Sequence, residues 1–558
     1  MFNLTATATN LINSPSPRTS RICFTLLLIV VLITAGVMVA MGATAQLLYP
    51  ADVPAMLDGG WRIMNGQIPH VDFYTPMGPV TFLVVAFGMW LGGACASSIA
   101  YANAVLLVVF GLWAWAVART RLSAVLSFLF ALYVGFMVGA TSIYGHSFKG
   151  LGYSAMYNRY GVALTALVVL EALGCPWRQC GPWSYAVQGM STGIALAIMF
   201  FLKLNFFGVA FLGIIVGTIL LPQHRHRWIG LCAGALAVSV VMLAYLRFDI
   251  AAFHHDITMA AKLRGVGFIR NAFGMVTDPA VFSSVFLMIT LWCVAPVADG
   301  YYRSWMSPRC GQGLLVLFLI VVQALLSLTN TQPPLPTLLP VASLLVLEAA
   351  RRAVAVGGGI GGHPDPGTPM SESGQVGTGR PPLQGGWVAT LLLALYFVAS
   401  ILLPDMESLP YSAFIRTVGV RGAAVTERFI SPPMADMLMP RDPEYVRSVN
   451  DGCELLRSHS KPSDRIVTMD LCNPFSYALQ RVPPTGDAIY WNQQTFSRNV
   501  HLNPERVFQQ AAIVMVPKKP IESRPDRQPM DVYATFIDAH YTLGAESTFW
   551  RLYQRRPN

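Results

Sequence analysis

The sequence predicts an all-α polytopic membrane domain of about 11–12 transmembrane helices, followed by a small C-terminal α/β soluble domain. The first observation is composition. Of the 558 residues, 54% are hydrophobic and 12% are charged, whereas soluble domains contain about 25% charged residues. The second is a change near residue 404, because 17 of the 28 acidic residues follow it. We therefore expect a membrane domain over 22–403 and an external domain over 404–558.

The polar residues 1–21 are predicted to form a cytoplasmic tail. The first apolar run, Ile22–Leu48, is longer than the roughly 7–15 residues of a signal-peptide core, so we expect an uncleaved helix. Further apolar runs lie at Pro79–Cys95, Ala100–Ala118, Leu122–Ile143, Tyr160–Leu173, Tyr185–Leu202, Asn205–Leu221, Trp228–Leu246, Ala280–Ala298, Gly313–Leu328, Leu335–Ala349 and Trp387–Leu403.

The run Pro79–Cys95 is short, and whether it crosses the membrane decides the sidedness of every later segment. If it stays outside, the 20 Lys and Arg of the first 404 residues divide as 12 inside and 8 outside; if it crosses, they divide as 9 and 11. Basic residues favour the cytoplasmic side of membrane proteins. The count therefore favours the first arrangement, which has about eleven crossings and an external C-terminus.

Residues 354–386 are rich in Gly and Pro and are predicted to be a disordered cytoplasmic linker. In the C-terminal domain, the short runs Arg465–Met469, Ala511–Val516 and Phe549–Tyr553 are typical of strands. Cys453 and Cys472 stand in this polar part, and the sequence leaves open whether they form a disulfide.

Several function classes are excluded by composition and motifs. The net charge of +10 comes from scattered basic residues and not from one basic face, so we expect no nucleic-acid partner. The sequence has no Walker-type phosphate loop, no GxGxxG and no Asp-x-Asp pair, which argues against nucleotide-dependent enzymes. The nine cysteines show no CxxC spacing, so a structural zinc site is not expected.

The most informative stretch is the predicted external active-site loop, residues 49–79. It contains three of the eleven acids in the first 404 residues, Asp52, Asp58 and Asp72. Acids gathered beside membrane segments point to function. Asp52 is expected to cap a short helix that Gly66 ends, so that Asp58 and Arg62 share one face at i, i+4.

The stretch DGGWRIMNGQIPHVDF, Asp58–Phe73, with Gly78 and Pro79 after it, resembles the first external loop of the GT-C superfamily. These are multi-pass glycosyltransferases that use polyprenyl-phosphate sugars, such as protein mannosyltransferases and the lipid A aminoarabinose and galacturonic acid transferases. The resemblance extends more loosely to Tyr157–Arg159 and Lys203. It implies a GT-C type fold, an active site on the external face, and a bacterial inner membrane with a periplasmic C-terminal domain.

In that superfamily the acid of this loop is the proposed base, which the resemblance places on Asp58. Many members have a second acid next to it, whereas this chain has Gly59, which weakens the case for a metal bound there. We therefore predict that Asp58 is the general base of an inverting transfer; the alternative is a surface acid paired with Arg62. Asp72 is a secondary candidate, although its place among turn-forming residues favours a turn-stabilising role.

Cations are needed to neutralise the departing phosphate. The candidates for phosphate or donor binding are Lys203, Arg159, Arg62, Lys262, Arg264 and Arg270. For Lys203 and Arg159 the alternative is snorkelling to the membrane interface. His254, His255 and Asp256 are adjacent on a predicted helix and point about 100° apart, so no metal site is expected there.

We therefore predict a membrane glycosyltransferase that moves a monosaccharide from a polyprenyl-phosphate donor to a glycan, lipid or protein acceptor. No cofactor is indicated, although a divalent cation is possible. The rival from another class is a transporter or flippase of lipid-linked sugars, but internal repeats typical of many transporters are not visible.

Overall fold

The structure is a computed structural model that describes residues 17–176, 181–221, 224–264, 289, 306–329, 338, 340–346, 348–349, 402–418, 427–492, 496–521 and 528–557. The linker 354–386, most of the cytoplasmic tail 1–21 and nearly all of the apolar runs at 280–298 and 387–403 therefore lie outside the described residues.

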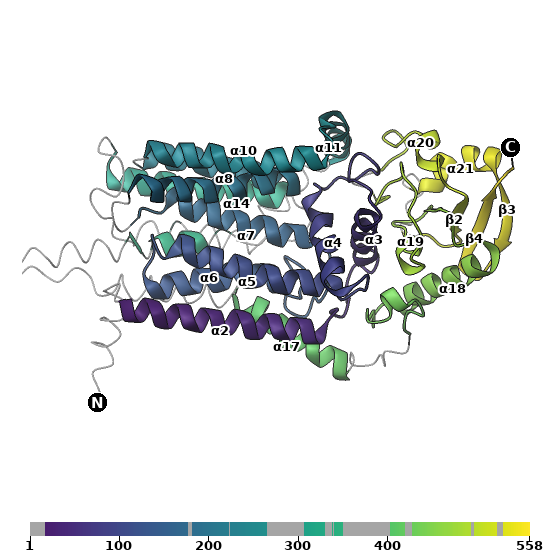
Figure 1. Cartoon of the computed structure of the whole chain (residues 1–558), viewed down its shortest axis with the longest axis horizontal. Helices are drawn as coiled ribbons and strands as arrows, with labels where there is room; N and C mark the ends of the chain where they lie inside the picture. The colour runs from purple at the N-terminus through teal and green to yellow at the C-terminus, as the bar shows by residue number, and fades with distance from the viewer. Residues whose placement is uncertain are drawn as a thin grey trace, which may run out of the picture.

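A bundle of long helices forms one half of the molecule, and a smaller mixed domain forms the other (Figure 1). The helices of the membrane half are α2 Pro17–Met41, α3 Asp52–Met64, α4 Val80–Gly92, α5 Ser98–Ala118, α6 Ala124–Gly139, α7 Met156–Leu173, α8 Pro182–Leu202, α9 Leu204–Leu220, α10 Arg225–Tyr245, α11 Ile250–Arg264, α14 Pro308–Thr329 and α17 Leu403–Val418. In the described residues, α2, α5, α8, α10 and α14 are long and apolar enough to cross a membrane. The chain is an integral membrane protein.

Local sequence explains how these helices end and pack. α2 ends at Met41, seven residues before the end of its apolar run, because Gly42 has a φ of +67°. α8 and α10 approach closely through glycines spaced four residues apart on each helix. A Cβ added at Gly189 would lie 1.9 Å from the Arg227 carbonyl oxygen, and one at Gly230 would lie 1.9 Å from that of Ala186.

The short run at Pro79–Cys95 forms α4, which has 13 residues. At 1.5 Å per residue it is about 20 Å long, shorter than the roughly 30 Å hydrocarbon core. It lies across the end of the bundle beside α3 (Figure 1). That α4 stays outside the membrane remains a prediction from the distribution of basic residues.

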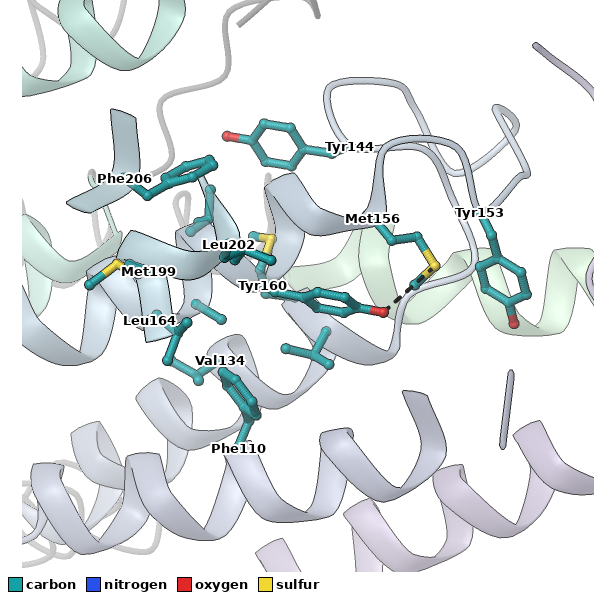
Figure 2. Packing of buried hydrophobic residues seen from close by; sticks show 14 of the residues in the cluster. Phe110, Val134, Tyr144, Tyr153, Met156, Tyr160, Leu164, Met199, Leu202 and Phe206 are labelled. Carbon is teal, nitrogen blue, oxygen red and sulfur yellow. Dashed lines mark hydrogen bonds between the residues drawn. The ribbon is translucent and has the colours of Figure 1, made fainter. Parts of the chain in front are cut away.

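α7 runs through the middle of the bundle, and 17 of its 18 residues are buried. Figure 2 shows the packing at its N-terminal end, where the Tyr160 hydroxyl points toward the Met156 sulfur at 3.9 Å. The same hydroxyl donates a hydrogen bond to the Asn103 side-chain oxygen at 2.5 Å. The exception to burial in α7 is Tyr157, which faces the site described below.

The C-terminal half is an α/β domain built on a four-stranded sheet in the order β1-β2-β4-β3. β1 is parallel to β2, and the other two pairs are antiparallel. Three strands lie where the sequence predicts them, whereas β3 was not anticipated. The helices and strands described in the C-terminal domain are η3 Pro432–Met434, α18 Pro443–His459, β1 Ile466–Thr468, α19 Phe475–Ala478, α20 Pro504–Phe508, β2 Ile513–Pro517, α21 Pro529–His540, β3 Tyr541–Glu546 and β4 Trp550–Arg555.

The loop between α2 and α4 packs against this domain and is joined to it by backbone hydrogen bonds. Tyr74 N donates to the Asp487 carbonyl at 2.9 Å, and Gln46 N donates to the Leu438 carbonyl at 2.7 Å. One hydrophobic core also runs from the bundle into the domain and includes Leu57 and Phe475. The predicted active-site loop is therefore enclosed between two halves and does not stand free in solvent.

Cys453 and Cys472 are both buried and free, so they do not form the disulfide that the sequence left open. Cys453 lies on α18, whereas the Cys472 thiol donates to the Ala51 carbonyl at 3.3 Å.

Candidate active site

Asp58 lies on α3 within a buried ion-pair triad. The Arg62 Nε donates to Asp58 Oδ2 at 2.8 Å, and the two terminal nitrogens of Arg62 donate to the carboxylate oxygens of Asp487 at 2.6 and 2.9 Å. Arg62 also donates to the Pro484 carbonyl at 2.9 Å. Asp487 belongs to the C-terminal domain, so the triad fastens the loop helix to that domain.

The triad is sealed from solvent, because Asp58 is 1% exposed and Arg62 is 0% exposed. Burial raises the Asp58 pKa to about 6, opposed by the charge and the hydrogen bond of Arg62. Asp58 Oδ1 has no hydrogen-bond partner among the described residues. The pairing with Arg62 predicted from i, i+4 spacing is therefore present, but it is buried and not at the surface.

Asp52, the first residue of α3, has different surroundings. It was expected to cap the helix, but that prediction is wrong, because Ala51 is the N-cap residue and no side chain caps this end. The Asp52 carboxylate instead accepts a hydrogen bond from the Ser154 hydroxyl, and its backbone carbonyl accepts one from the Tyr490 hydroxyl at 3.0 Å. Asp52 is partly exposed, and burial of its carboxylate raises its pKa to about 6, opposed by Ser154.

Lys203 lies between α8 and α9, next to Leu202, whose carbonyl accepts a hydrogen bond from Gly78 N of the loop. Its Nζ donates to the side-chain oxygen of Asn158 at 2.8 Å. The same nitrogen lies 5.1 Å from the centre of the Tyr157 ring and 5.8 Å from that of Phe206. These contacts fix the Lys203 ammonium beside Asn158 and the Tyr157 ring.

Asp52 and Lys203 are both held at the start of α7. Ser154, two residues before that helix, donates to the Asp52 carboxylate, and Asn158, in its first turn, accepts from Lys203. Tyr490 also contacts Asp52, and burial raises the pKa of the Tyr490 hydroxyl well above its usual value. The arrangement places a partly exposed acid, two phenols and an ammonium near the start of α7.

Arg159 is oriented differently from its neighbours Tyr157 and Asn158. It is buried, and it donates to Asp405 at 3.0 Å, to the Ser142 carbonyl at 2.9 Å and to the Ser142 hydroxyl at 2.9 Å. These contacts join α7 to α17 and the loop after α6. They support a structural role, and phosphate binding by Arg159 stays a prediction.

The remaining candidates are Asp72, Lys262, Arg264 and Arg270. Asp72 accepts from Ile68 N at 2.8 Å, which is the turn-stabilising contact that its sequence context favours. Lys262 is exposed on α11, and Arg264 is the last residue of that helix. Arg270 lies outside the described residues.

His254, His255 and Asp256 lie on α11. Asp256 is buried and contacts His70 Nδ1 at 3.0 Å and His255 Nδ1 at 3.3 Å, whereas the His255 side chain is 58% exposed. Within the described part of the chain, no group of three or more His, Cys, Asp or Glu is arranged to hold a metal ion.

Sequence reasoning named Asp52 but gave it a capping role, and it missed Ser154 and Tyr490. The spacing of Asp52 and Asp58 does show that the two acids differ in direction, because residues six apart on a helix lie about 120° apart around its axis. Ser154 and Tyr490 carry no local signal, because they reach Asp52 from segments 102 and 438 residues away in sequence.

No protein-family model matches the chain, and no curated protein sequence matches it. Among solved structures, it is similar to ArnT from Cupriavidus metallidurans, both bound to undecaprenyl phosphate and in the apo state. The identity is 13% and the TM-score 0.42, over 96% of this chain and 99% of that one. It is also similar to the oligosaccharyltransferase of Archaeoglobus fulgidus in complex with Zn and sulfate, with 9% identity and a TM-score of 0.35, over 88% of this chain and 68% of that one.

Proposed function

We propose that this chain is a membrane glycosyltransferase that moves a monosaccharide from a polyprenyl-phosphate donor to a hydroxyl acceptor on the outer face. The observation that carries the proposal is that Asp52 and Lys203 both bind side chains at the start of α7, Ser154 and Asn158 respectively. A carboxylate supplies a base, and a lysine ammonium supplies a phosphate ligand.

In the reaction, the acceptor hydroxyl gives its proton to a carboxylate as its oxygen attacks the anomeric carbon. The bond between that carbon and the phosphate oxygen breaks, and the phosphate leaves with the electron pair. Lys203 neutralises the added negative charge on the phosphate. Direct displacement inverts the anomeric carbon. The prenyl tail is expected to lie along the apolar helices.

The choice of base lies between two residues of α3. Asp58 is the acid that the loop pattern predicts, but Arg62 occupies one of its oxygens and the residue is sealed. Asp52 is partly exposed and has the same raised pKa of about 6. The contacts therefore favour Asp52 as the base and Asp58 as a positioning residue that holds α3 against the C-terminal domain. Donor binding by Arg62, Lys262, Arg264 and Arg270 stays a prediction.

The test is to incubate the purified chain in lipid nanodiscs with a panel of polyprenyl-phosphate sugars and a membrane extract as the acceptor pool. We expect one sugar to be consumed with release of free polyprenyl phosphate, followed by mass spectrometry. A transporter or flippase would instead move the lipid-linked sugar across sealed vesicles without cleaving it. Movement without cleavage for every sugar in the panel would overturn the proposal.

A further inference from the structure

The C-terminal domain contains a cavity of about 460 Å³ that no part of the reaction described above uses. Its walls come from the first turn of α18, the segment after β1, the segment after β2 and the start of β4. The volume falls in the range of about 300–1,000 Å³ that small-molecule sites usually have.

The cavity opens beside the N-terminal end of α3. Pro50, two residues before Asp52, is one of its lining residues. Another is Cys472, whose thiol donates to the carbonyl of Ala51, the residue immediately before Asp52. Tyr445 also lines it, and the Asp52 carboxylate is among the charges that act on the Tyr445 hydroxyl. The cavity therefore lies beside the segment that leads into α3 and the proposed base.

Asp470 is the buried polar group of the cavity, with 5% of its surface exposed. Its Oδ1 accepts hydrogen bonds from Leu471 N at 2.8 Å and Ile521 N at 3.0 Å, which fixes the carboxylate. Among the described residues, no donor is placed at Oδ2. A fixed carboxylate with a second acceptor oxygen suits a hydroxyl donor.

The charges around the cavity are balanced. Three basic and three acidic side chains line it: Arg441, Arg447, Lys519, Asp442, Glu444 and Asp470. Lys519 already pairs with Glu444 at 3.1 Å. A site for a polyanion would carry a net positive charge, so the balance favours a ligand that is neutral overall and rich in hydroxyl groups.

We propose that this cavity binds the acceptor of the transfer, and that the acceptor is an uncharged saccharide held by Asp470 at the edge of the active site. This inference rests on the proposed function, because the bound sugar presents its hydroxyl to Asp52. Free oligosaccharides and the glycan of a lipid or protein share this chemistry.

The experiment measures saccharide binding to the full chain without any donor. The probes are neutral manno-, gluco- and galacto-oligosaccharides of two to four units, with uronic acid oligosaccharides of the same lengths as charged counterparts. We expect saturation-transfer NMR to detect a neutral oligosaccharide, and we expect Asp470→Asn to weaken its binding by about tenfold or more.

Because Asp470 also accepts two backbone hydrogen bonds, a second variant keeps the test independent of folding. Lys519→Trp places an indole at an exposed position on the cavity wall and should block binding. Lys461→Trp makes the same change at an exposed residue that does not line the cavity, and should bind like wild type.

Binding of the uronic acid series in preference to the neutral one, or equal binding by wild type and Lys519→Trp, would overturn the inference. Donor cleavage is measured separately. If a donor is cleaved but no neutral saccharide binds, the acceptor assignment fails while the proposed function stands. If a neutral saccharide binds in the cavity but no donor is cleaved, the proposed reaction fails while the saccharide site stands.

Discussion

The two carboxylates of α3 have the same raised pKa of about 6 but opposite surroundings. Asp58 is closed in by Arg62 and Asp487, whereas Asp52 is partly exposed and bound by a neutral hydroxyl, that of Ser154. In both cases burial is the largest cause of the shift. The comparison teaches that a perturbed pKa alone does not identify a base, because the group must also reach the substrate.

The largest effect is expected from Asp52→Asn. It removes the base while keeping the shape of the side chain, so turnover should fall by roughly 10²–10⁴-fold. Donor binding and the thermal unfolding midpoint should stay close to wild type, because Asp52 makes no ion pair in the described structure. The rate of polyprenyl phosphate release measures the effect.

Asp58→Asn is the matched comparison for Asp52→Asn. If Asp58→Asn abolishes turnover with the fold intact while Asp52→Asn does not, the roles of the two acids are exchanged and the sequence-based prediction is right.

Arg62→Met tests the buried ion-pair triad that surrounds Asp58. The substitution leaves two buried carboxylates, Asp58 and Asp487, without their cation, which should destabilise the fold by about 3–5 kcal/mol. Thermal unfolding in detergent, followed by fluorescence, measures the loss. Arg457→Met, at an exposed position on α18, is the control and should leave the midpoint near wild type. An unfolding midpoint for Arg62→Met equal to that of the control would mean that the triad does not hold α3 in place.

Lys203→Met tests the proposed phosphate ligand. Losing a charged donor to the phosphate should raise the donor KM by roughly tenfold or more, because hydrogen bonds to charged groups contribute about 1.5–3 kcal/mol. Lys262→Met serves as the counterpart. It removes a lysine that is exposed on α11, and it should raise the donor KM less. An equal rise of the donor KM in both variants would mean that several basic side chains attract the phosphate together, and that Lys203 does not bind it specifically.

The smallest effect is a shift in pH dependence. A base must be ionised, so kcat/KM should fall as the pH drops below about 6, by tenfold per pH unit. The Ser154 hydrogen bond lowers the Asp52 pKa, so Ser154→Ala should move this acid limb to higher pH. An unmoved limb would point to Asp58, which Ser154 does not contact in the described structure.

The sequence by itself determined the class of the molecule. Apolar runs, scarce charges and the change near residue 404 depend on residues close together in the chain, and they predicted the helical bundle, the short α4 and three of the four strands. β3 was missed because its residues alternate weakly, and its burial pattern has one fully buried position, at Tyr541.

Only the tertiary structure decided the surroundings of each acid. The loop has three carboxylates, and their local sequence does not show that Asp487 lies over Arg62 or that Tyr490 lies beside Asp52. Those contacts join segments more than 400 residues apart. The reason is physical: the cost of burying a charge depends on which groups surround it in space, and this is set by packing between the two halves of the chain.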